Sequence, residues 1–462
     1  MRADNRTSGA QLSICGTAFH APNRGELEVL SGVLIDMGPD GSIARITKPG
    51  DRDYAARKSA AMRSGTLLEL AGAQYLLPGF VDLHIHAPQF PQLGKALDAP
   101  LEDWLQKYTF PLEARYADEA FAAAVYERLV TTLLANGTTT AVYFATRHLE
   151  ASLTLAQTCL HKGQRAVIGR VAMDDEQQCP AYYRDASPQE GVDLTRHFID
   201  RLRALPGNDQ ALVRPAVTPR FIPSCSDGLL HGLGDLAKSQ GCHMQTHCSE
   251  SDWAHNYVFE RFGKSDTEML DEFGLLTRKS ILAHANFMSG GDLDLVRLRG
   301  SGIAHCPLSN FYFANAVFPL RRALDRGVHV GLGTDISGGH SPSILDNCRH
   351  ATMAARALHD GVDARIAAAE RGAKPARIAL QEAFWLATAG GGEVLDLPIG
   401  LFREGMRFDA MVVDVNAPHS NIVPADDDGP PDIFQKILCN AGRPNIVSVW
   451  VDGRLVHSFS GA

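Results

Sequence analysis

Strand-like and helix-like segments alternate through the middle of this 462-residue chain. One helix is clearly marked, because Asp118 can cap a helix that carries Phe121 and Val125 on one face. This alternation predicts parallel strands joined by helices, and eight strands favour a closed (β/α)8 TIM-like barrel over an open sheet. The predicted barrel strands are residues 77–86, 138–144, 165–171, 212–217, 243–247, 280–284, 302–306 and 328–334.

The two ends of the chain carry short strand-like segments of their own. A Gly-Pro-Asp-Gly turn at residues 38–41 separates two of them, and Asp452-Gly453 predicts a tight hairpin in the last. The sequence therefore predicts an α/β protein in which residues 1–76 and 398–462 form one small β-sandwich domain beside a barrel of residues 77–397. The strands predicted at the ends are residues 11–18, 32–37, 42–46, 410–415 and 446–456.

Composition and charge argue against several classes of function. A formal net charge of −9 disfavours nucleic acid or an anionic membrane as the main partner. No apolar run of about eighteen residues is present, so no membrane span is predicted. Residues 1–6 lack the apolar core of a signal peptide, which predicts a cytoplasmic protein. Nine cysteines without a Cys-x-x-Cys pair predict neither a disulfide framework nor a cysteine-rich zinc site.

Potential metal ligands occur where the predicted barrel strands end. His84 and His86 are two residues apart, so both side chains point to the same face of their strand. His247, His284 and Asp335 end later strands, and the C-terminal ends of barrel strands meet at one face. Imidazoles and a carboxylate gathered there can hold a divalent ion, with zinc favoured and iron or manganese also accepted. Such an ion lowers the pKa of its bound water from ~15.7 to about 7.

The order of these motifs resembles the amidohydrolase superfamily over nearly the whole chain. The segment from Pro78 to His86 reads Pro-Gly-Phe-Val-Asp-Leu-His-Ile-His, and His247, His284 and a Gly-Thr-Asp that ends at Asp335 follow it in order. Several smaller motifs resemble the branch of that superfamily that deaminates guanine. These motifs are His86-Ala87-Pro88-Gln89, Trp104-Leu105, Tyr108 to Glu113, Thr218-Pro219-Arg220-Phe221 and Thr246 to Glu250.

The resemblance implies a role for each residue of the candidate site. The implied metal ligands are His84, His86, His247 and Asp335, the implied catalytic residues are Glu250, His284 and Asp335, and the implied purine contacts are Gln89, Arg220 and Phe221. The resemblance also implies one Zn²⁺ per subunit, with Fe²⁺ as an alternative, a small-molecule purine substrate and a homodimer. In the implied reaction, activated water attacks C2 of guanine, Glu250 carries a proton to N3, His284 orients the water or the oxyanion, and xanthine and ammonia leave.

Lysine is absent from the predicted fourth barrel strand. Many members of the superfamily that hold two metal ions carry a bridging lysine there, whereas residues 212–219 read Leu-Val-Arg-Pro-Ala-Val-Thr-Pro. The absence favours one metal ion. Residues 102–108 follow the first barrel strand and are predicted to form a lid or a wall near the pocket.

Three alternatives to guanine deamination remain open at this point. The first is an aminohydrolase for another purine, a pterin or a triazine, and the pair Gln89 and Arg220 favours guanine without deciding between them. The second is a cyclic-amide hydrolase, which the missing lysine disfavours. The third is a non-catalytic barrel, which is disfavoured because all implied ligands and Glu250 are retained.

Overall fold

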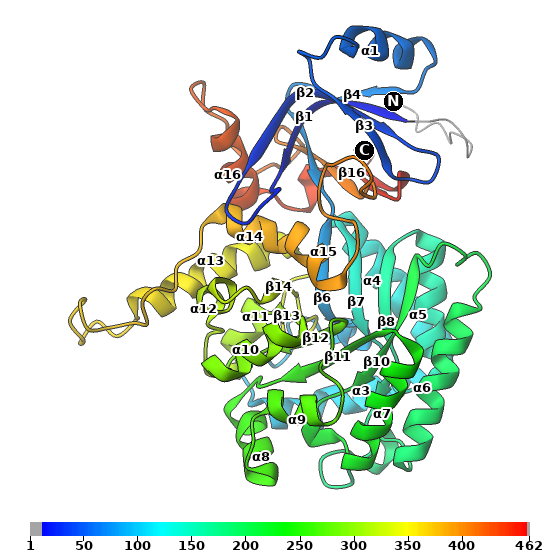
Figure 1. Ribbon diagram of the computed structural model, residues 1–462, viewed down its shortest axis with the longest axis vertical. Coiled ribbons are helices and arrows are strands. Elements are labelled where there is room, and N and C mark those ends of the chain that lie inside the picture. The colour runs from blue at the N-terminus through cyan, green and yellow to red at the C-terminus, as the bar shows by residue number, and fades with distance from the viewer. Residues whose placement is uncertain (1–11, 460–462) are drawn as a thin grey trace.

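The computed structural model describes residues 12–459. Residues 1–6, on which the prediction about a signal peptide rests, and Gln11, the first residue of a predicted strand, lie outside the described part. Eight parallel strands follow one another in chain order around a barrel (Figure 1). The predicted (β/α)8 barrel is therefore confirmed. Its strands are β6 (Phe80–His86), β7 (Thr138–Phe144), β8 (Arg165–Gly169), β10 (Val213–Pro219), β11 (His243–Cys248), β12 (Ser280–His284), β13 (Gly302–His305) and β14 (His329–Leu332), with the short β9 (Val171–Ala172) beside the end of β10.

Backbone hydrogen bonds join the first and the last barrel strands. The N–H of Asp335 donates to the carbonyl of His84 over 2.8 Å, and the N–H of His86 donates to the carbonyl of Ile336 over 2.7 Å. Both bonds lie just after β14 and at the C-terminal end of β6. The ends of these two strands, far apart in the sequence, are therefore held side by side.

Helices surround the barrel strands, and the sequence explains where one of the longest begins. Asp118 accepts hydrogen bonds from the N–H groups of Ala120 and Phe121, which confirms the predicted N-cap. The helices of this part of the chain are α2 (Leu101–Trp104), α3 (Phe110–Ala114), α4 (Glu119–Ala135), α5 (Leu149–Lys162), α6 (Pro188–Arg203), α7 (Asp227–Gln240), α8 (Asp252–Phe262), α9 (Asp266–Glu272), α10 (Gly290–Arg299), α11 (Pro307–Ser309), α12 (Leu320–Asp325), α13 (Ile344–Asp360), α14 (Leu380–Ala387) and α15 (Ala389–Leu395). The short turns between them are η1 (Ala87–Gln92), η2 (Leu105–Thr109), η3 (Arg115–Ala117), η4 (Ala181–Tyr183), η5 (Ile222–Ser224) and η6 (Asn310–Ala314).

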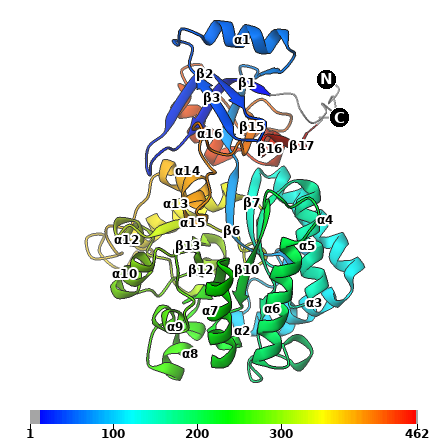
Figure 2. The same cartoon turned by 45° about the vertical axis from the view of Figure 1, so that its right-hand side comes forward.

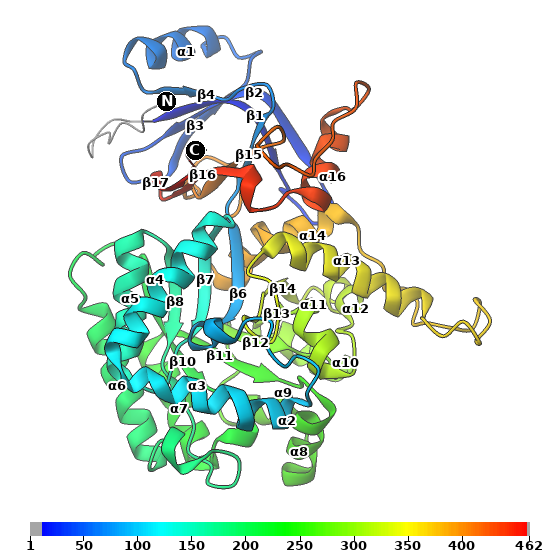
Figure 3. The ribbon, with the colours of Figure 1, turned by 180° about the vertical axis from the view of Figure 1, so that it is seen from behind.

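Strands from both ends of the chain form a second sheet, called the terminal sheet below, at the top of Figures 1 and 2. Its strands are β1 (Ser13–His20), β2 (Glu28–Met37), β3 (Ile43–Thr47), β4 (Leu67–Glu69), β5 (Gln74–Pro78), β15 (Ala410–Asp414), β16 (Ile446–Val451) and β17 (Arg454–Ser458). The elements beside them are α1 (Tyr54–Arg63), α16 (Pro430–Asn440) and η7 (Arg443–Asn445), and the rear view in Figure 3 shows α1 and α16 on different sides of the sheet.

The terminal sheet is mixed and joins the two chain ends directly. β5 pairs antiparallel with β15, while β1 pairs antiparallel with β2 and parallel with β4 and β5. One apolar cluster draws on both ends, with Ile14 and Val33 beside Phe408 and Trp450. These contacts confirm the predicted small β domain built from both ends, whereas its predicted boundaries at residues 76 and 398 stay a prediction.

The hairpin predicted near the C-terminal end is confirmed within residues 12–459. The predicted hairpin turn joins β16 to β17, and its residues Asp452 and Gly453 have φ angles of 49° and 72°, which a tight turn of this kind requires. All nine cysteines are free, and only Cys439 is exposed. In the described residues, no helix combines the length and the apolar character needed to cross a membrane.

A buried ion pair ties the barrel to the terminal sheet. Arg165, the first residue of β8, donates through two nitrogens to Asp409 over 3.1 Å each, and it also binds Asp452. The side chains of Arg165 and Asp409 are 6% and 1% exposed. Because this contact forms at the first residue of a barrel strand, the opposite, C-terminal ends of the strands point away from the terminal sheet.

We expect Arg165→Met to destabilise the protein by about 3–5 kcal/mol, because it leaves the carboxylate of Asp409 buried without its cation. Urea unfolding followed by tryptophan fluorescence and circular dichroism measures the loss. Arg365→Met is the matched control, since Arg365 pairs with Asp363 at the surface, and we expect it to change stability by less than about 0.5 kcal/mol. Equal effects of the two substitutions would contradict this account.

Candidate active site

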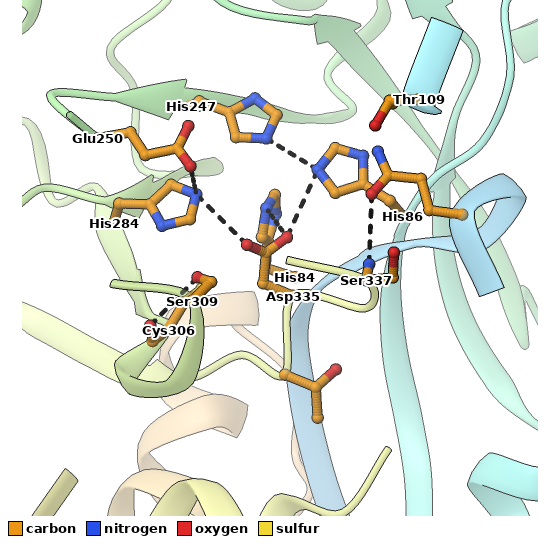
Figure 4. Close-up of polar contacts among 12 residues, drawn as sticks. His84, His86, Thr109, His247, Glu250, His284, Cys306, Ser309, Asp335 and Ser337 are labelled. Atoms are coloured by element: carbon orange, nitrogen blue, oxygen red, sulfur yellow. Dashed lines mark hydrogen bonds and ion pairs between the residues drawn. The ribbon is translucent and has the colours of Figure 1, made fainter. Parts of the chain in front are cut away.

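Histidines and a carboxylate from four separate segments meet at the C-terminal ends of the barrel strands (Figure 4). β6 supplies His84 and His86, β11 supplies His247, β12 supplies His284, and Asp335 follows β14. All five side chains are buried. The structure thus gathers the residues that the sequence predicted at the strand ends.

The distances within this cluster suit a cation. Nε2 of His86 lies 2.9 Å from Nε2 of His247, and Nε2 of His84 lies 3.2 Å from Oδ1 of Asp335. Candidate ligand atoms of His84, His86 and His247 all lie within 4.8 Å of one another. Nε2 of His84 is buried and has no hydrogen-bond partner among the described residues. Buried imidazole nitrogens that lie this close to one another and to a carboxylate oxygen fit a divalent ion, which accepts their lone pairs.

The protonation of the imidazoles agrees with this fit. Burial holds the pKa values of His84, His86 and His247 well below their usual range, so the rings are neutral and keep a lone pair. Nδ1 of His247 lies 2.5 Å from the backbone carbonyl of Arg220, and a carbonyl only accepts hydrogen bonds. The proton of His247 is therefore on Nδ1, and Nε2 presents its lone pair to the cluster.

Two acidic groups and one imidazole face each other beside the metal-binding cluster. Nε2 of His284 lies 3.6 Å from Oε1 of Glu250 and 3.9 Å from Oδ2 of Asp335. Burial, with the charge of Asp335 nearby, raises the pKa of Glu250 to about 8. Burial also raises the pKa of Asp335 to about 6. A carboxyl that keeps its proton at neutral pH and a carboxylate that lacks one can exchange protons with a molecule between them.

Unusual backbone conformations position these side chains. Ser249, His284 and Asp335 have φ angles of 47°, 72° and 49°, in the left-handed region that side-chain-bearing residues rarely adopt. Each such conformation costs about 1–3 kcal/mol and persists only where the surrounding structure enforces it. For Asp335, the hydrogen bond from its N–H to His84 supplies that constraint.

A buried polar network lies next to the cluster. Glu113 receives hydrogen bonds from two nitrogens of Arg220, over 2.7 and 3.1 Å, and from Nε2 of Gln89 over 2.9 Å. Oε1 of Gln89 accepts from the N–H of Ser337 over 3.3 Å. Sequence reasoning quoted Glu113 within a motif but gave it no role. Its partners lie 107 and 24 residues away, and no local pattern indicates such a contact.

Aromatic and apolar side chains complete a pocket around these groups. Phe221 lies on one side, with its ring 6.1 Å from that of His247. Trp104 and Phe313 line the pocket with ring centroids 5.2 Å apart, and π-helical turns at η2 and η6 hold this part of the wall. Trp104 confirms the wall predicted from residues 102–108, whereas Phe313 is a lining residue that sequence reasoning missed.

The structure brings all nine predicted site residues together. Seven of them line the pocket, and the other two, His84 and His284, lie within 4 Å of Asp335 in the cluster. The seven are His86, Gln89, Arg220, Phe221, His247, Glu250 and Asp335.

A barrel with metal-binding groups at its strand ends and a pocket above them defines a class of metal-dependent hydrolases. The amidohydrolase family profile matches residues 75–456. The chain belongs to this family, and it is a hydrolase that acts on C–N bonds.

Several relatives within the family are guanine deaminases. The probable guanine deaminase of Schizosaccharomyces pombe is 38% identical over 450 residues, which cover 96% of this chain and 83% of that protein. The guanine deaminase of Homo sapiens is 36% identical over 456 residues, which cover 97% of each. A solved structure of guanine deaminase from C. acetobutylicum, with guanine bound in its active site, matches with a TM-score of 0.86 and 28% identity over 97% of this chain and 100% of that chain.

We expect a chelator to lower the unfolding temperature and added Zn²⁺ to restore it, because a ligand that binds only the folded state stabilises it by about 4 kcal/mol at 1,000 times its Kd. Thermal unfolding followed by circular dichroism measures both steps. His86→Asn should lose the recovery. The matched control is His243→Asn, because His243 contacts the carbonyl of Leu395 and begins β11 at the other end of the barrel. Full recovery of the His86 variant would show that this cluster is not the metal site.

Proposed function

We propose that the protein is a guanine deaminase, which hydrolyses guanine to xanthine and ammonia. The observation that carries this proposal is one pocket in which a metal-binding cluster meets side chains that match the edge of a purine. Gln89 and Arg220 line the same pocket as His86 and Asp335. The guanine deaminases that align along nearly the whole chain support the same reaction.

We propose that one divalent ion, zinc in preference to iron, is held by His84, His86, His247 and Asp335. When bound, such an ion lowers the pKa of water so that hydroxide is available at neutral pH. The imidazole-rich set favours zinc. The fourth barrel strand, β10, contains no lysine to bridge a second ion, which supports a single site.

The hydrogen-bonding capacity left over in the polar network suits guanine. Arg220 has five N–H groups, and Glu113 occupies only part of them, so the rest can donate to the carbonyl or a ring nitrogen. Gln89 keeps one N–H and one oxygen lone pair beyond its bonds to Glu113 and Ser337. A purine edge that alternates donors and acceptors uses both. Phe221 offers an aromatic wall for the flat ring.

Proton transfer falls to the acidic groups of the site. Asp335 accepts a proton from the attacking water with the oxygen that faces His284. Glu250, whose raised pKa keeps it protonated at neutral pH, delivers its proton to N3 of guanine as C2 becomes tetrahedral. Glu250, now a carboxylate, takes the proton of the new hydroxyl on C2 as that group becomes the carbonyl, and passes it to the departing amino group, which leaves as ammonia. The proton that Asp335 accepted from water then returns Glu250 to its acid form. His284 orients the attacking water through Nε2, which faces the reacting centre.

The remaining expectations from the sequence stay predictions. These are the homodimer and the cytoplasmic location. A pterin or triazine substrate stays an alternative outcome of the assay below, and cyclic-amide hydrolysis is disfavoured by the same missing lysine on β10.

We expect the zinc-loaded protein to release ammonia from guanine and to form xanthine, and to act far more slowly on adenine, cytosine, 8-oxoguanine and a pterin. Ammonia release and chromatography of the products measure this preference. Activity on a different base would keep the metal site and overturn the substrate. No activity on any base, with metal bound, would overturn deamination and favour a cyclic amide as substrate.

We expect Glu250→Gln to lower kcat by roughly 10²–10⁴-fold, because it removes the proton carrier and keeps the shape of the side chain. Metal content, measured by elemental analysis, should stay close to one ion per chain, since Glu250 is not among the proposed ligands. Glu260→Gln, an exposed carboxylate on α8, is the control and should behave as wild type. Unchanged turnover in the Glu250 variant would remove it from the mechanism.

A further inference from the structure

A chain of side-chain amides connects His284 to the backbone of Glu250. Nδ2 of Asn286 donates to the backbone carbonyl of Glu250 over 2.9 Å. Nδ2 of Asn310 donates to Oδ1 of Asn286 over 2.8 Å, and Oδ1 of Asn310 lies 3.0 Å from Nδ1 of His284. All of these side chains are buried, so water does not offer them other partners. We call Asn286 and Asn310 the amide relay.

The direction of every hydrogen bond in the amide relay follows from its far end. A backbone carbonyl only accepts, so Asn286 must present its NH₂ group to Glu250 and its oxygen to Asn310. Asn310 must then donate to that oxygen, which leaves its own oxygen facing His284. An amide oxygen only accepts, so Nδ1 of His284 must carry the proton.

The other nitrogen of His284 faces the reacting centre. Nε2 is buried and has no hydrogen-bond partner among the described residues. Its nearest acidic groups are Glu250 at 3.6 Å and Asp335 at 3.9 Å, as Figure 4 shows. The carboxylate of Asp335 favours a proton on Nε2, so without the amide relay the ring would carry its proton there and become a donor. The amide relay and Asp335 therefore act on the same proton in opposite directions.

We infer that Asn286 and Asn310 are positioning residues that hold the proton of His284 on Nδ1 and keep Nε2 as a hydrogen-bond acceptor. The inference about the proton rests on the hydrogen bonds alone. Its consequence for catalysis rests on the proposed function: Nε2 accepts a hydrogen bond from the attacking water and so aims an oxygen lone pair at C2 of guanine. The same chain fixes the backbone at Glu250, so the acceptor and the proton carrier keep their relative position.

The π-helical turn η6 explains how Asn310 reaches His284. Asn310 is the first residue of this turn, which follows α11 directly after β13. Such turns interrupt regular helices and occur often at functional sites. Asn310 is 3% exposed, and both ends of its amide are used. A side chain held in this way has one orientation.

Nuclear magnetic resonance of the zinc-loaded protein with ¹⁵N-labelled histidine tests the tautomer directly. We expect long-range ¹H–¹⁵N correlations to show His284 protonated on Nδ1, with the signals assigned by their loss in His284→Asn. In Asn310→Leu, which offers Nδ1 no acceptor, the proton should move to Nε2. Asn310→Asp keeps an oxygen in place and should retain the Nδ1 proton. Wild-type His284 protonated on Nε2 would overturn the inference.

Kinetics with guanine separate positioning from a general loss of structure. We expect Asn310→Leu to lower kcat about tenfold or more and to change KM less than about threefold, with Asn310→Asp recovering much of the loss. Asn208→Ala removes a buried asparagine that bonds to Val213 at the other end of the barrel, and it should leave both the tautomer and kcat unchanged. An equal loss in Asn310→Asp and Asn310→Leu would contradict the role of the acceptor.

The two proposals fail in different ways. In one case guanine is not deaminated, but His284 carries its proton on Nδ1 in the wild type and in Asn310→Asp and loses it there in Asn310→Leu. The amide relay then stands and the proposed function falls. If guanine is deaminated and the tautomer does not respond to Asn310→Leu, the function stands and the amide relay falls.

Discussion

The candidate site depends on closure of the barrel between its first and last strands. The hydrogen bonds from Asp335 to His84 and from His86 to Ile336 hold the end of β6 against the segment after β14. Two histidines from the start of the barrel and an aspartate from its end thereby share one space. An open sheet would leave these groups on opposite edges, and no ligand cluster would form. The strain at Asp335, with its φ of 49°, is maintained by the same contact.

Sequence reasoning succeeded where a periodic pattern determines direction. His84 and His86 share a face because side chains alternate along a strand, and His247 and Asp335 were placed because barrel strands end at a common face. The hairpin at Asp452 was readable because few residues favour its positive φ. Such features depend on residues close in the sequence and on the regular repeat of strands and helices in a barrel. Both can be recognised from the sequence alone.

Sequence reasoning failed where contacts depend on how loops pack. Glu113 neutralises Arg220 from α3, in the segment that follows the first barrel strand, and Phe313 reaches Trp104 from the π-helical turn η6, in the segment that follows the seventh. Neither contact follows from periodicity, since loops at the barrel ends have no fixed register. The terminal sheet shows the same limit, because alternation in β1 does not reveal that it pairs with both β4 and β5.

The orientation of the histidines is decided outside the cluster that they form. Nδ1–H of His247 donates a hydrogen bond to the carbonyl of Arg220, and Nδ1–H of His284 donates one to Oδ1 of Asn310. Both rings therefore present Nε2 inward, one as a proposed metal ligand and one as the proposed hydrogen-bond acceptor for the attacking water. Arg220 has two separate tasks, because its backbone carbonyl orients His247 while its guanidinium, held by Glu113, faces the substrate pocket. The proposed metal site and the proposed purine site are thus joined through one residue, so a change in the position of Arg220 would affect both.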